Sequence, residues 1–351
     1  MAINENPQSP RDFRFGFAQQ LAFGTAIAPT VDLDGTTPEF GYEIDCDPFD
    51  IEYGVTEYSN IGSHGTRSLK DNDYVMHSRR AMPGFSVTGP ANHNTLDHFL
   101  NSYFQNVTET ATTPFGKTFT PHTTQPNFVT AAAVADCHLS TWFIWDPVAG
   151  DGRRVKDVLC QTLVITGEVG QPIKITATMV GNGAPDLDQT ISGTWTRATT
   201  TDLWYFEDLD RASLDFGGGS VNVLLQSFEF TFSRSVIAVG QGDGTGGFSL
   251  YGLSGRDLAA KIKVVKDADW NTAVTNFTTD TAISGRIGIG NATAGTDDGD
   301  LDFVFRGKAT STPVAYEDIM YGELNMRLLE SNDGATKPIT IVMANALDRT
   351  W

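Results

Sequence analysis

The sequence predicts a mainly β fold in which one unit of strands and a helix occurs twice. Gly (35 residues) and Phe (22 residues) are abundant while Lys and Arg together number 24, a balance that suits a β chain with many turns. Several stretches alternate apolar and polar residues with the period of a half-buried strand. The order strand, long loop, strand, helix and hairpin recurs after residue 190, so we expect one domain at 1–190 and a second at 191–351.

The first half is expected to start with an N-terminal arm over residues 1–41, which packs late or on a neighbouring molecule. A strand is predicted near Tyr42–Tyr53. The polar, glycine-bearing segment Val55–Arg80 that follows is too long for an ordinary hairpin loop, and such loops are usually functional or disordered.

A short strand at Phe85–Thr88 precedes a predicted helix, which Asn92 or Asn94 is expected to cap. Apolar residues recur through this segment at helical spacing and would form one face of the helix. These residues are Leu96, Phe99, Leu100, Tyr103 and Phe104.

A strand at Ser140–Trp145 leads to residues 156–181, the stretch with the clearest strand pattern. Both of its arms are rich in β-branched residues, and two glycines and Pro172 stand where the chain must reverse. The stretch therefore predicts a long β-hairpin with one buried and one polar face. The residues of the second arm expected to face the core are Ile173, Ile175, Ala177 and Met179.

The second half begins after a Gly-, Thr- and Asp-rich boundary at 182–201 that shows no periodicity. A strand region at Ser220–Phe232 is expected to precede a long glycine-bearing loop at Arg234–Arg256 and a short strand at Lys261–Val265. This loop matches the position of the long loop in the first half.

Asp267 or Asp269 is then expected to cap a second helix, whose apolar residues repeat the spacing of the first. They are Trp270, Ala273, Val274 and Phe277. A strand at Leu301–Phe305 leads to a predicted closing hairpin with arms Leu324–Leu329 and Ile339–Met343. The core-facing residues of its second arm are expected to be Ile339, Ile341 and Met343.

The charge balance excludes an ordinary nucleic-acid-binding protein. Asp and Glu number 43 against 24 Lys and Arg, and the formal net charge of −19 repels a phosphate backbone. Three cysteines without a CxxC pair predict no disulfide framework, and Cys160 is expected to be buried as a small hydrophobic residue. There is no basic leader and no run of eighteen apolar residues, so we expect a soluble protein made in a cytoplasm, without a membrane partner.

The motifs that usually carry chemistry predict no catalytic residue, no metal site and no cofactor. His93 and His98 are five residues apart and so lie on different faces of a helix, unlike the ligands of a zinc helix. Cys137 and His138 are adjacent, and adjacent residues on a strand point to opposite faces. Neither pair therefore predicts a site.

Two predicted loops contain residues typical of ligand-binding motifs. The glycine run at 240–247 lacks the terminal Gly-Lys-Ser/Thr of a phosphate-binding loop and predicts a flexible loop. The acidic turn Asp297–Asp302 has carboxylates for Ca²⁺ but no Glu at a twelfth position. A solvated turn is expected there, and the sequence leaves calcium binding open.

Four phrases follow one another in a characteristic order: Ala22–Ala26, the segment 79–89 with its helix, Ser140–Ile144, and the hairpin that begins at Val158. This order resembles the tail tube (major tail) proteins of long-tailed bacteriophages, and the resemblance covers most of the chain. It implies a β-sandwich or half-barrel with one flanking helix, whose strands join those of neighbouring subunits around a channel. The chain departs from the single-domain members of this family in its length and in its second copy of the unit, so the expected fold is a duplicated one.

The resemblance also implies a function and partners. The chain is expected to form stacked rings, which build the hollow tube of the virion tail through which DNA is ejected. It implies rings of three duplicated chains or of six chains, assembly in the host cytoplasm, and contact with the tape measure, tail terminator and distal tail proteins. Double-stranded DNA is expected to pass without specific binding.

The polar face of each predicted hairpin is expected to line the channel. The candidate lumen residues are Thr162, Thr166, Lys174, Thr176, Thr178, Asn325, Arg327 and Thr340. Carboxylates of turns, such as Glu168, Glu330 and Asp333, are expected to outnumber the cations near the bore. The two long loops are expected to reach the adjacent ring, with Ser59, His64, Arg67, Lys70, Gly242, Gly244 and Gly246 as candidate contacts.

Two other classes fit parts of the sequence. A carbohydrate-binding or carbohydrate-cleaving β-sandwich needs paired carboxylates and exposed aromatic residues at one site, for which Asp208, Asp210, Trp142, Trp145, Trp204 and Tyr205 are the candidates. A capsid-decorating or adhesin-like surface protein shares the acidic all-β composition.

Overall fold

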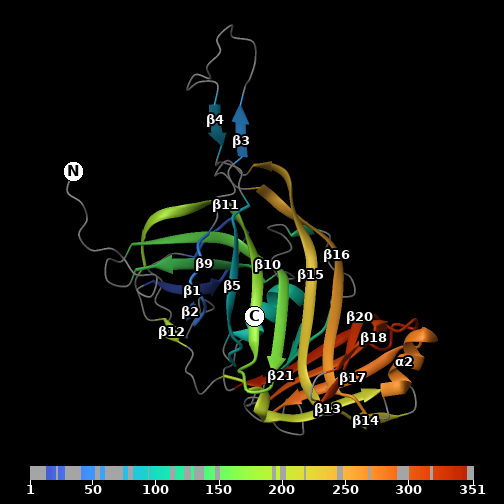
Figure 1. Cartoon of the computed structure of the whole chain (residues 1–351). Helices are drawn as coiled ribbons and strands as arrows, with labels where there is room; N and C mark the ends of the chain where they lie inside the picture. The colour runs from blue at the N-terminus through green and yellow to red at the C-terminus, as the bar shows by residue number, and fades with distance from the viewer. Residues whose placement is uncertain are drawn as a thin grey trace, which may run out of the picture.

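The fold is given by a computed structural model that describes residues 13–20, 23–27, 41–51, 56–59, 74–77, 82–93, 95–110, 115–121, 128–129, 138–146, 151–191, 195–197, 203–216, 219–242, 248–267, 270–290, 300–316 and 319–345. Strands dominate these residues, and the helices among them are two short α-helices and a 3₁₀ turn (Figure 1). The prediction of a mainly β protein is confirmed.

The elements of the first half are β1 (Arg14–Gln19), β2 (Gly41–Glu43), β3 (Thr56–Ser59), β4 (Tyr74–His77), β5 (Gly84–Pro90), α1 (Leu96–Phe104), β6 (Val107–Glu109), β7 (Phe115–Phe119), β8 (Phe128–Val129), β9 (Ser140–Trp145), β10 (Asp151–Glu168) and β11 (Lys174–Thr190). Those of the second half are β12 (Thr196–Arg197), η5 (Phe206–Asp208), β13 (Leu209–Asp215), β14 (Ser220–Asn222), β15 (Leu225–Gly242), β16 (Phe248–Val265), α2 (Trp270–Thr278), β17 (Ile283–Ile289), β18 (Leu301–Ser311), β19 (Val314–Tyr316), β20 (Met320–Leu328) and β21 (Ile339–Asn345).

One antiparallel sheet of long strands runs through both halves of the chain. Its order is β5, β11, β10, β15, β16 and β20. The predicted hairpin is its centre, because β10 pairs with β11 on one side. On the other side Thr162–Glu168 of β10 pairs with Ser227–Ser233 of β15, which joins the two halves by backbone hydrogen bonds.

A second layer lies across this sheet. In Figure 1, β13, β17, β18 and β21 run crosswise behind β10, β15 and β16. β18 connects the layers, because Gly307–Ser311 pairs with β20 and Leu301–Phe305 pairs with β21. In the first half β9 pairs with the start of β10, and β1 pairs with β9 and β2.

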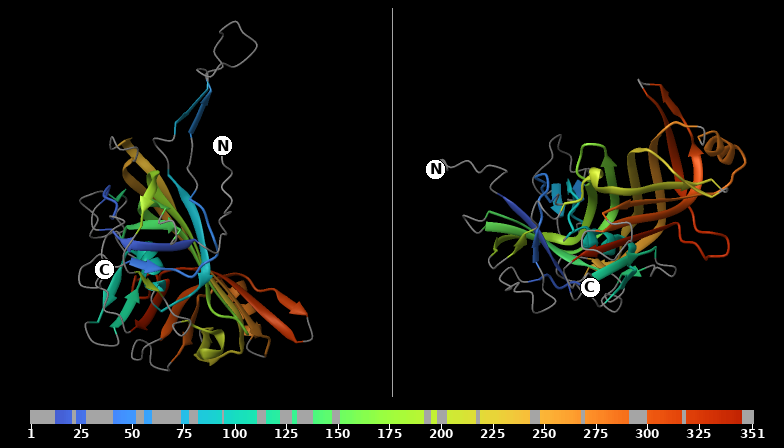
Figure 2. Two further views of the ribbon diagram at one scale, coloured as in Figure 1. Left: turned by 90° about the vertical axis from the view of Figure 1, so that its left-hand side faces the viewer. Right: turned by 90° about the horizontal axis from the view of Figure 1, so that it is seen from below.

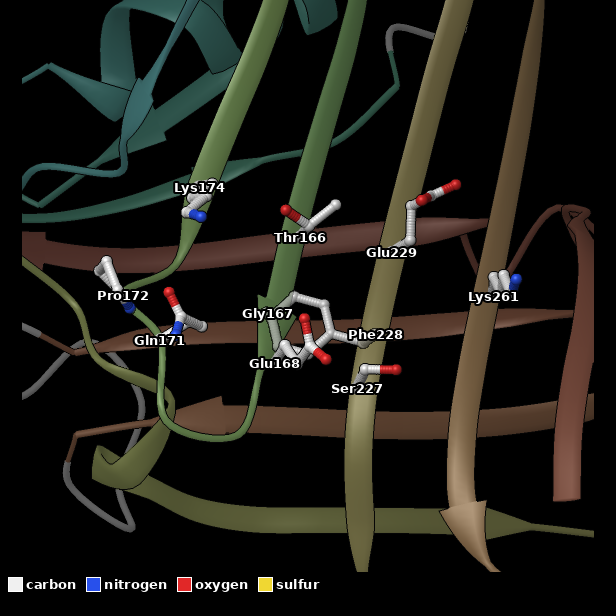
Figure 3. A pocket seen from close by; sticks show the side chains of 10 residues that line it. All are labelled: Thr166, Gly167, Glu168, Gln171, Pro172, Lys174, Ser227, Phe228, Glu229 and Lys261. Carbon is white, nitrogen blue, oxygen red and sulfur yellow. The ribbon is translucent and has the colours of Figure 1, made fainter. Parts of the chain in front are cut away.

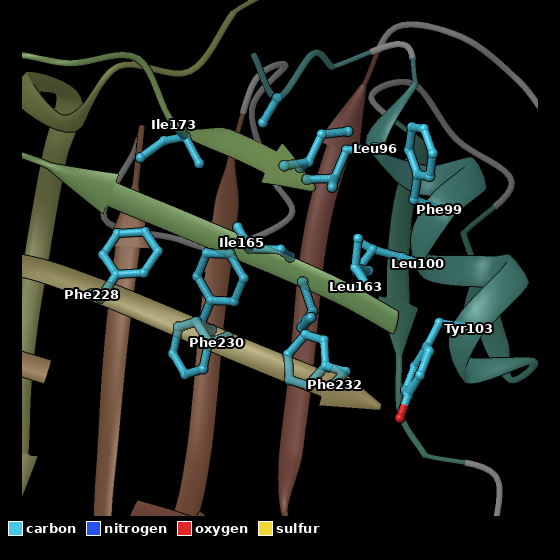
Figure 4. Close-up of a cluster of buried hydrophobic side chains, with 14 of the residues drawn as sticks. Leu96, Phe99, Leu100, Tyr103, Leu163, Ile165, Ile173, Phe228, Phe230 and Phe232 are labelled. Carbon is cyan, nitrogen blue, oxygen red and sulfur yellow. The ribbon is translucent and has the colours of Figure 1, made fainter. Parts of the chain in front are cut away.

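The core fills the space between the layers and is continuous across residue 190 (Figure 4). Phe228, Phe230 and Phe232 alternate along β15 and are buried. The Phe230 ring stacks on Phe303 of the second layer, with centroids 4.9 Å apart. Burying side chains of this size stabilises the fold by about 1.5–3 kcal/mol each. The residues predicted to face the core in β11 and β21 are also buried.

Helix α1 is enclosed on every side, since all nine of its residues are buried. Thr95 is the N-cap residue and makes no side-chain cap hydrogen bond. The prediction that Asn92 caps the helix is therefore wrong. Asn92 contributes its backbone carbonyl, which accepts a hydrogen bond from the Leu96 N–H at 3.0 Å. Asn94 lies outside the described residues.

The N-terminal strand packs on its own chain, in contrast to the expected arm on a neighbour. β1 pairs along its length with β9. Beyond it, Asp157, which stands at a bulge of β10 with φ +55°, accepts hydrogen bonds from the Gly24 N–H (2.8 Å) and from the Asn182 amide (3.0 Å). The Gln20 side-chain amide also donates to Asp157. Residues 1–12 lie outside the described part.

The predicted closing hairpin is wrong. β20 and β21 both form as strands, but they pair with opposite ends of β18 and not with each other. The turn between them is local, since the Ser331 N–H bonds the Thr336 carbonyl at 3.0 Å. The chain nevertheless passes from one layer to the other at this turn. β20 belongs to the large sheet and β21 to the second layer, and the apolar residues of both strands pack into the same core.

The predicted long loop at Arg234–Arg256 is wrong, and residues 182–190, where no periodicity was seen, continue a strand. β15 and β16 form a hairpin that pairs as far as Gly242 and Phe248. Buried Val236, Tyr251 and Leu253 supply its apolar contacts. At the expected boundary, β11 continues to Thr190 because the start of β10 pairs with it.

Candidate functional site

The outer face of the six-stranded sheet is mainly polar. Alternate residues of each strand are buried in the core, so the others point outward. The strand register aligns these residues in rows. One row is Thr88, Thr176, Val164, Thr231, Ala259 and Arg327. The next row is Pro90, Lys174, Thr166, Glu229, Lys261 and Asn325.

The structure brings seven of the eight candidate lumen residues onto this polar face. They are Thr162, Thr166, Lys174, Thr176, Thr178, Asn325 and Arg327. Thr340 does not join them. It lies in β21 opposite Val304 of β18, in the second layer.

Sequence reasoning missed that β15 and β16 supply the middle of this face. Glu229, Thr231 and Ser233 alternate with three buried phenylalanines, and Lys261 and Lys263 alternate with buried Ala260, Ile262 and Val264. This alternation is the same strand signal that identified β11. Strands were predicted at Ser220–Phe232 and Lys261–Val265, but their polar faces were not assigned to the channel.

The charges of the polar face are of both signs, and several are paired. Lys261 Nζ lies 3.2 Å from Glu323 Oε2, and Arg327 Nε lies 3.2 Å from Asp257 Oδ1. Lys263 Nζ lies 4.4 Å from the centroid of the Tyr321 ring. The described face therefore carries cations alongside its carboxylates, with acids supplied by the strands themselves and not by turns alone.

A hollow of about 280 Å³ opens on this face beside the β10–β11 turn (Figure 3). Gly167 beside it makes room for the buried Phe228 ring, since a Cβ at this position would come within 2.3 Å of that ring. The charged residues that line it are Glu168, Lys174, Glu229 and Lys261. The lining thus has both signs of charge. It contains no cysteine and no histidine, so its one serine, Ser227, has no histidine base beside it there.

The two side edges of the large sheet differ. On one side, the segment 45–47 lies alongside β5, where the Asp47 N–H donates a hydrogen bond to the Thr88 carbonyl at 2.7 Å. On the other, β18 and β19 pair with β20. Within the described part of the chain, no strand pairs with the outer side of residues 308–316. An edge of this kind is a template for pairing with another chain.

Two arginines, buried Arg234 and partly buried Arg256, connect the halves at the C-terminal end of α1. Arg234 of β15 donates to the carbonyls of Ser102 (2.7 Å), Tyr103 (3.0 Å) and Cys160 (2.8 Å). Arg256 of β16 donates to the Phe104 carbonyl at 3.1 Å. The last carbonyls of a helix lack partners within it and carry partial negative charge, so cations are favourable there.

Burial and the neighbouring Arg234 lower the pKa of Arg256 to about 10. Both guanidinium groups are therefore charged at neutral pH. Burial raises the pKa of the Cys160 thiol to about 12, which agrees with its expected role as a small buried hydrophobic residue.

Helix α2 has a different environment from α1. Its buried residues are Trp270, Ala273 and Asn276. Trp270 packs over Gly322 of β20, where a Cβ would come within 2.4 Å of its ring. Val274 is 36% exposed and Phe277 is 41% exposed. One side of α2 is thus apolar and open.

The candidate inter-ring residues are only partly described. β3 and β4 form a separate two-stranded sheet that stands away from the body (Figure 1, and Figure 2, left), and Ser59 pairs there with Tyr74. Gly242 ends β15 at the tip of the β15–β16 hairpin. His64, Arg67, Lys70, Gly244 and Gly246 lie outside the described residues.

The described residues hold no cluster of three or more His, Cys, Asp or Glu that could bind a metal ion. His98 stacks on the Phe17 ring, with centroids 3.8 Å apart. Asp302, at the end of the candidate calcium turn, is paired with Arg286 at 2.8 Å, and residues 297–299 are outside the described part. Neither described helix is long and apolar enough to cross a membrane.

The residues proposed for a carbohydrate site are not assembled into one. Trp142, Trp145 and Trp204 are buried in the core, while Tyr205 is 41% exposed. Core packing accounts for the three tryptophans, as for the large aromatic residues of other β-sandwiches.

The described fold is that of a mainly β protein whose large sheet has a mainly polar outer face and, among the described residues, one edge without a strand partner. The family model of the phage tail tube protein matches residues 14–338, nearly the whole chain. The chain belongs to this family, and it is a structural protein of the virion tail. A search of curated proteins finds no match.

Proposed function

We propose that this chain closes into rings of three copies, which stack into the hollow tube through which phage DNA leaves the virion. The observation that carries the proposal is the junction between its own halves. There β10 pairs with β15, and Arg234 and Arg256 of the other half donate to carbonyls at the C-terminal end of α1. We treat this junction as the template for the contact between chains.

The elements around the junction have counterparts at the other end of the sheet. β5, α1, β10 and β11 correspond in order to β16, α2, β18 with β19, and β20. Both helices have nine residues, and each follows a strand of the large sheet. This correspondence supports two copies of one unit at 1–190 and 191–351.

The counterpart of the β10 edge is the open edge of residues 308–316. The counterpart of enclosed α1 is half-exposed α2, in which Val274 and Phe277 occupy the places of Leu100 and Tyr103. In α1, Tyr103 packs against Phe232 from the other half, with centroids 5.9 Å apart. The first half of a second copy, presenting β5 and residues 45–51, supplies the missing strand and the missing cover.

Repeated three times, this contact continues the sheet around a ring and leaves no edge unpaired. The polar rows then form the wall of the bore, and the second layer lies outside it. The β3–β4 sheet and the β15–β16 tip meet the adjacent ring. Assembly takes place in the host cytoplasm, with tape measure, tail terminator and distal tail proteins as further partners.

The test is a substitution on the open side of α2. Val274→Glu with Phe277→Glu places two charges in the proposed contact, while both positions are already partly exposed in the single chain. We expect a folded monomer by circular dichroism and loss of tubes in negative-stain micrographs. Thr275→Glu, on the side of the helix away from its buried residues, is the matched control and should assemble.

Axial images of wild-type tubes decide the copy number. Three chains in each ring, seen as a ring with six similar domains, support the proposal. Six chains in each ring, or normal tubes from the double Glu variant, contradict it.

A further inference from the structure

The two ion pairs of the polar face have a role that fold stability does not explain. The side chains of Arg327 and Asp257 are each 61% exposed, and those of Lys261 and Glu323 are 49% and 28% exposed. Exposed pairs of this kind contribute about 0–1 kcal/mol to folding. Their presence on this face calls for a reason other than stability.

Each pair spans neighbouring strands. Lys261 and Asp257 lie on β16, and Glu323 and Arg327 lie on β20. The Asn325 amide donates to the second oxygen of Glu323 at 3.1 Å, so this carboxylate is held from two sides.

A cation binds DNA by replacing the counterions of a phosphate, which makes the binding strongly dependent on salt. A Lys or Arg beside a carboxylate must give up that partner first. In a tube the same cation recurs in every chain of every ring, so unmasked cations would form a ladder of phosphate sites along the bore.

We propose that Glu323 and Asp257 mask Lys261 and Arg327, and that this keeps the polar face from retaining duplex DNA. The proposal rests on the proposed function, because it takes this face as the wall of the bore. It differs from a wall that repels DNA by carboxylates alone. At these two positions the face keeps its cations and neutralises them locally across adjacent strands.

The test uses the soluble full-length chain and a fluorescent 20-base-pair duplex, with binding followed by anisotropy from 20 to 200 mM NaCl. Glu323→Gln with Asp257→Asn unmasks both cations. We expect at least about tenfold tighter binding than wild type at the lowest salt. The logarithm of affinity should fall against the logarithm of salt with a slope of about −2, near −0.9 for each unmasked cation.

Two controls separate masking from net charge. Glu207→Gln with Asp208→Asn removes the same charge from the 3₁₀ turn outside the face and should leave binding as in wild type. Lys261→Glu with Glu323→Lys exchanges the partners of one pair, retains the charge, and should also behave as wild type. Equal binding by wild type and the unmasked variant overturns the proposal, as does tighter binding by the net-charge control.

Release of DNA from virions that carry the unmasked variant tests the underlying function separately. Slow, salt-dependent release is expected. If the soluble variant binds the duplex but release is unchanged, masking stands and the assignment of this face to the bore fails.

Discussion

Arg234 shows how a single side chain joins the two halves. It is 4% exposed, and its guanidinium donates to carbonyls from α1 and from β10. Each of these carbonyls would be left buried and without this donor if the side chain were truncated, and hydrogen bonds to a charged group contribute about 1.5–3 kcal/mol. No pattern in the sequence indicates this role, because an Arg in a predicted loop is normally solvated.

We expect Arg234→Met to lower the free energy of unfolding by about 3 kcal/mol or more, since it keeps the aliphatic bulk and removes all the donors. Urea unfolding followed by tryptophan fluorescence measures the change. Arg327→Met, on the exposed face, is the control and should cost at most about 1 kcal/mol. Equal losses for the two variants would contradict the assigned role.

Individual elements were predictable where the signal is local. The alternation of Ile173, Ile175 and Met179 gave β11 and its buried face, and helical spacing gave α1. The partners of β20 and β21 were not predictable, because strand pairing depends on which wall of the core each apolar face meets. The β15–β16 hairpin was missed since its glycine run suggests a loop, while buried Val236 and Tyr251 extend the strands beyond Arg234 and Arg256.

These corrections change how the inter-ring proposal is tested. Removing Arg234–Arg256 would delete the arginines that bind α1 and would unfold the chain. The β3–β4 sheet offers a cleaner site, because Ser59 and Tyr74 are already paired and a short turn can join them.

Replacing residues 60–73 with Asn-Gly should leave a folded monomer with the thermal stability of wild type, since β3 and β4 form a sheet of their own. We expect the variant to form no extended tubes, as measured by sedimentation and negative-stain microscopy. Replacing residues 331–334 of the β20–β21 connection with another four-residue turn is the control. Tubes of normal length from the shortened chain would show that this segment does not connect rings.

For the whole molecule, the polar face gives a direct test of the channel. Thr176 and Thr178 lie on the central rows of the face and are half-buried. Thr176→Lys with Thr178→Lys adds two cations without a carboxylate opposite them in the register, where their neighbours are threonine, serine and valine. Assembly should be retained, because neither position faces the core.

We expect virions with this variant to release DNA several-fold more slowly at low salt and to recover as salt is raised. Thr340→Lys is the matched control, since it adds a cation on the second layer. A fluorescent dye that binds released DNA gives the rate. The proposal fails if tubes form normally and the release rate matches wild type at every salt concentration.

The pairing of β10 with β15 also bears on how assembly begins. Because these strands belong to one polypeptide, half of the contacts in a three-chain ring form during folding, at an effective concentration set by the tether and not by the amount of protein. Only the contacts at the open edge then depend on encounters between chains. Ring closure therefore varies with a lower power of protein concentration than it would for six separate domains. Tethering also keeps the two halves in equal numbers. Every ring therefore contains as many open edges at residues 308–316 as first-half edges beside β5 to pair with them.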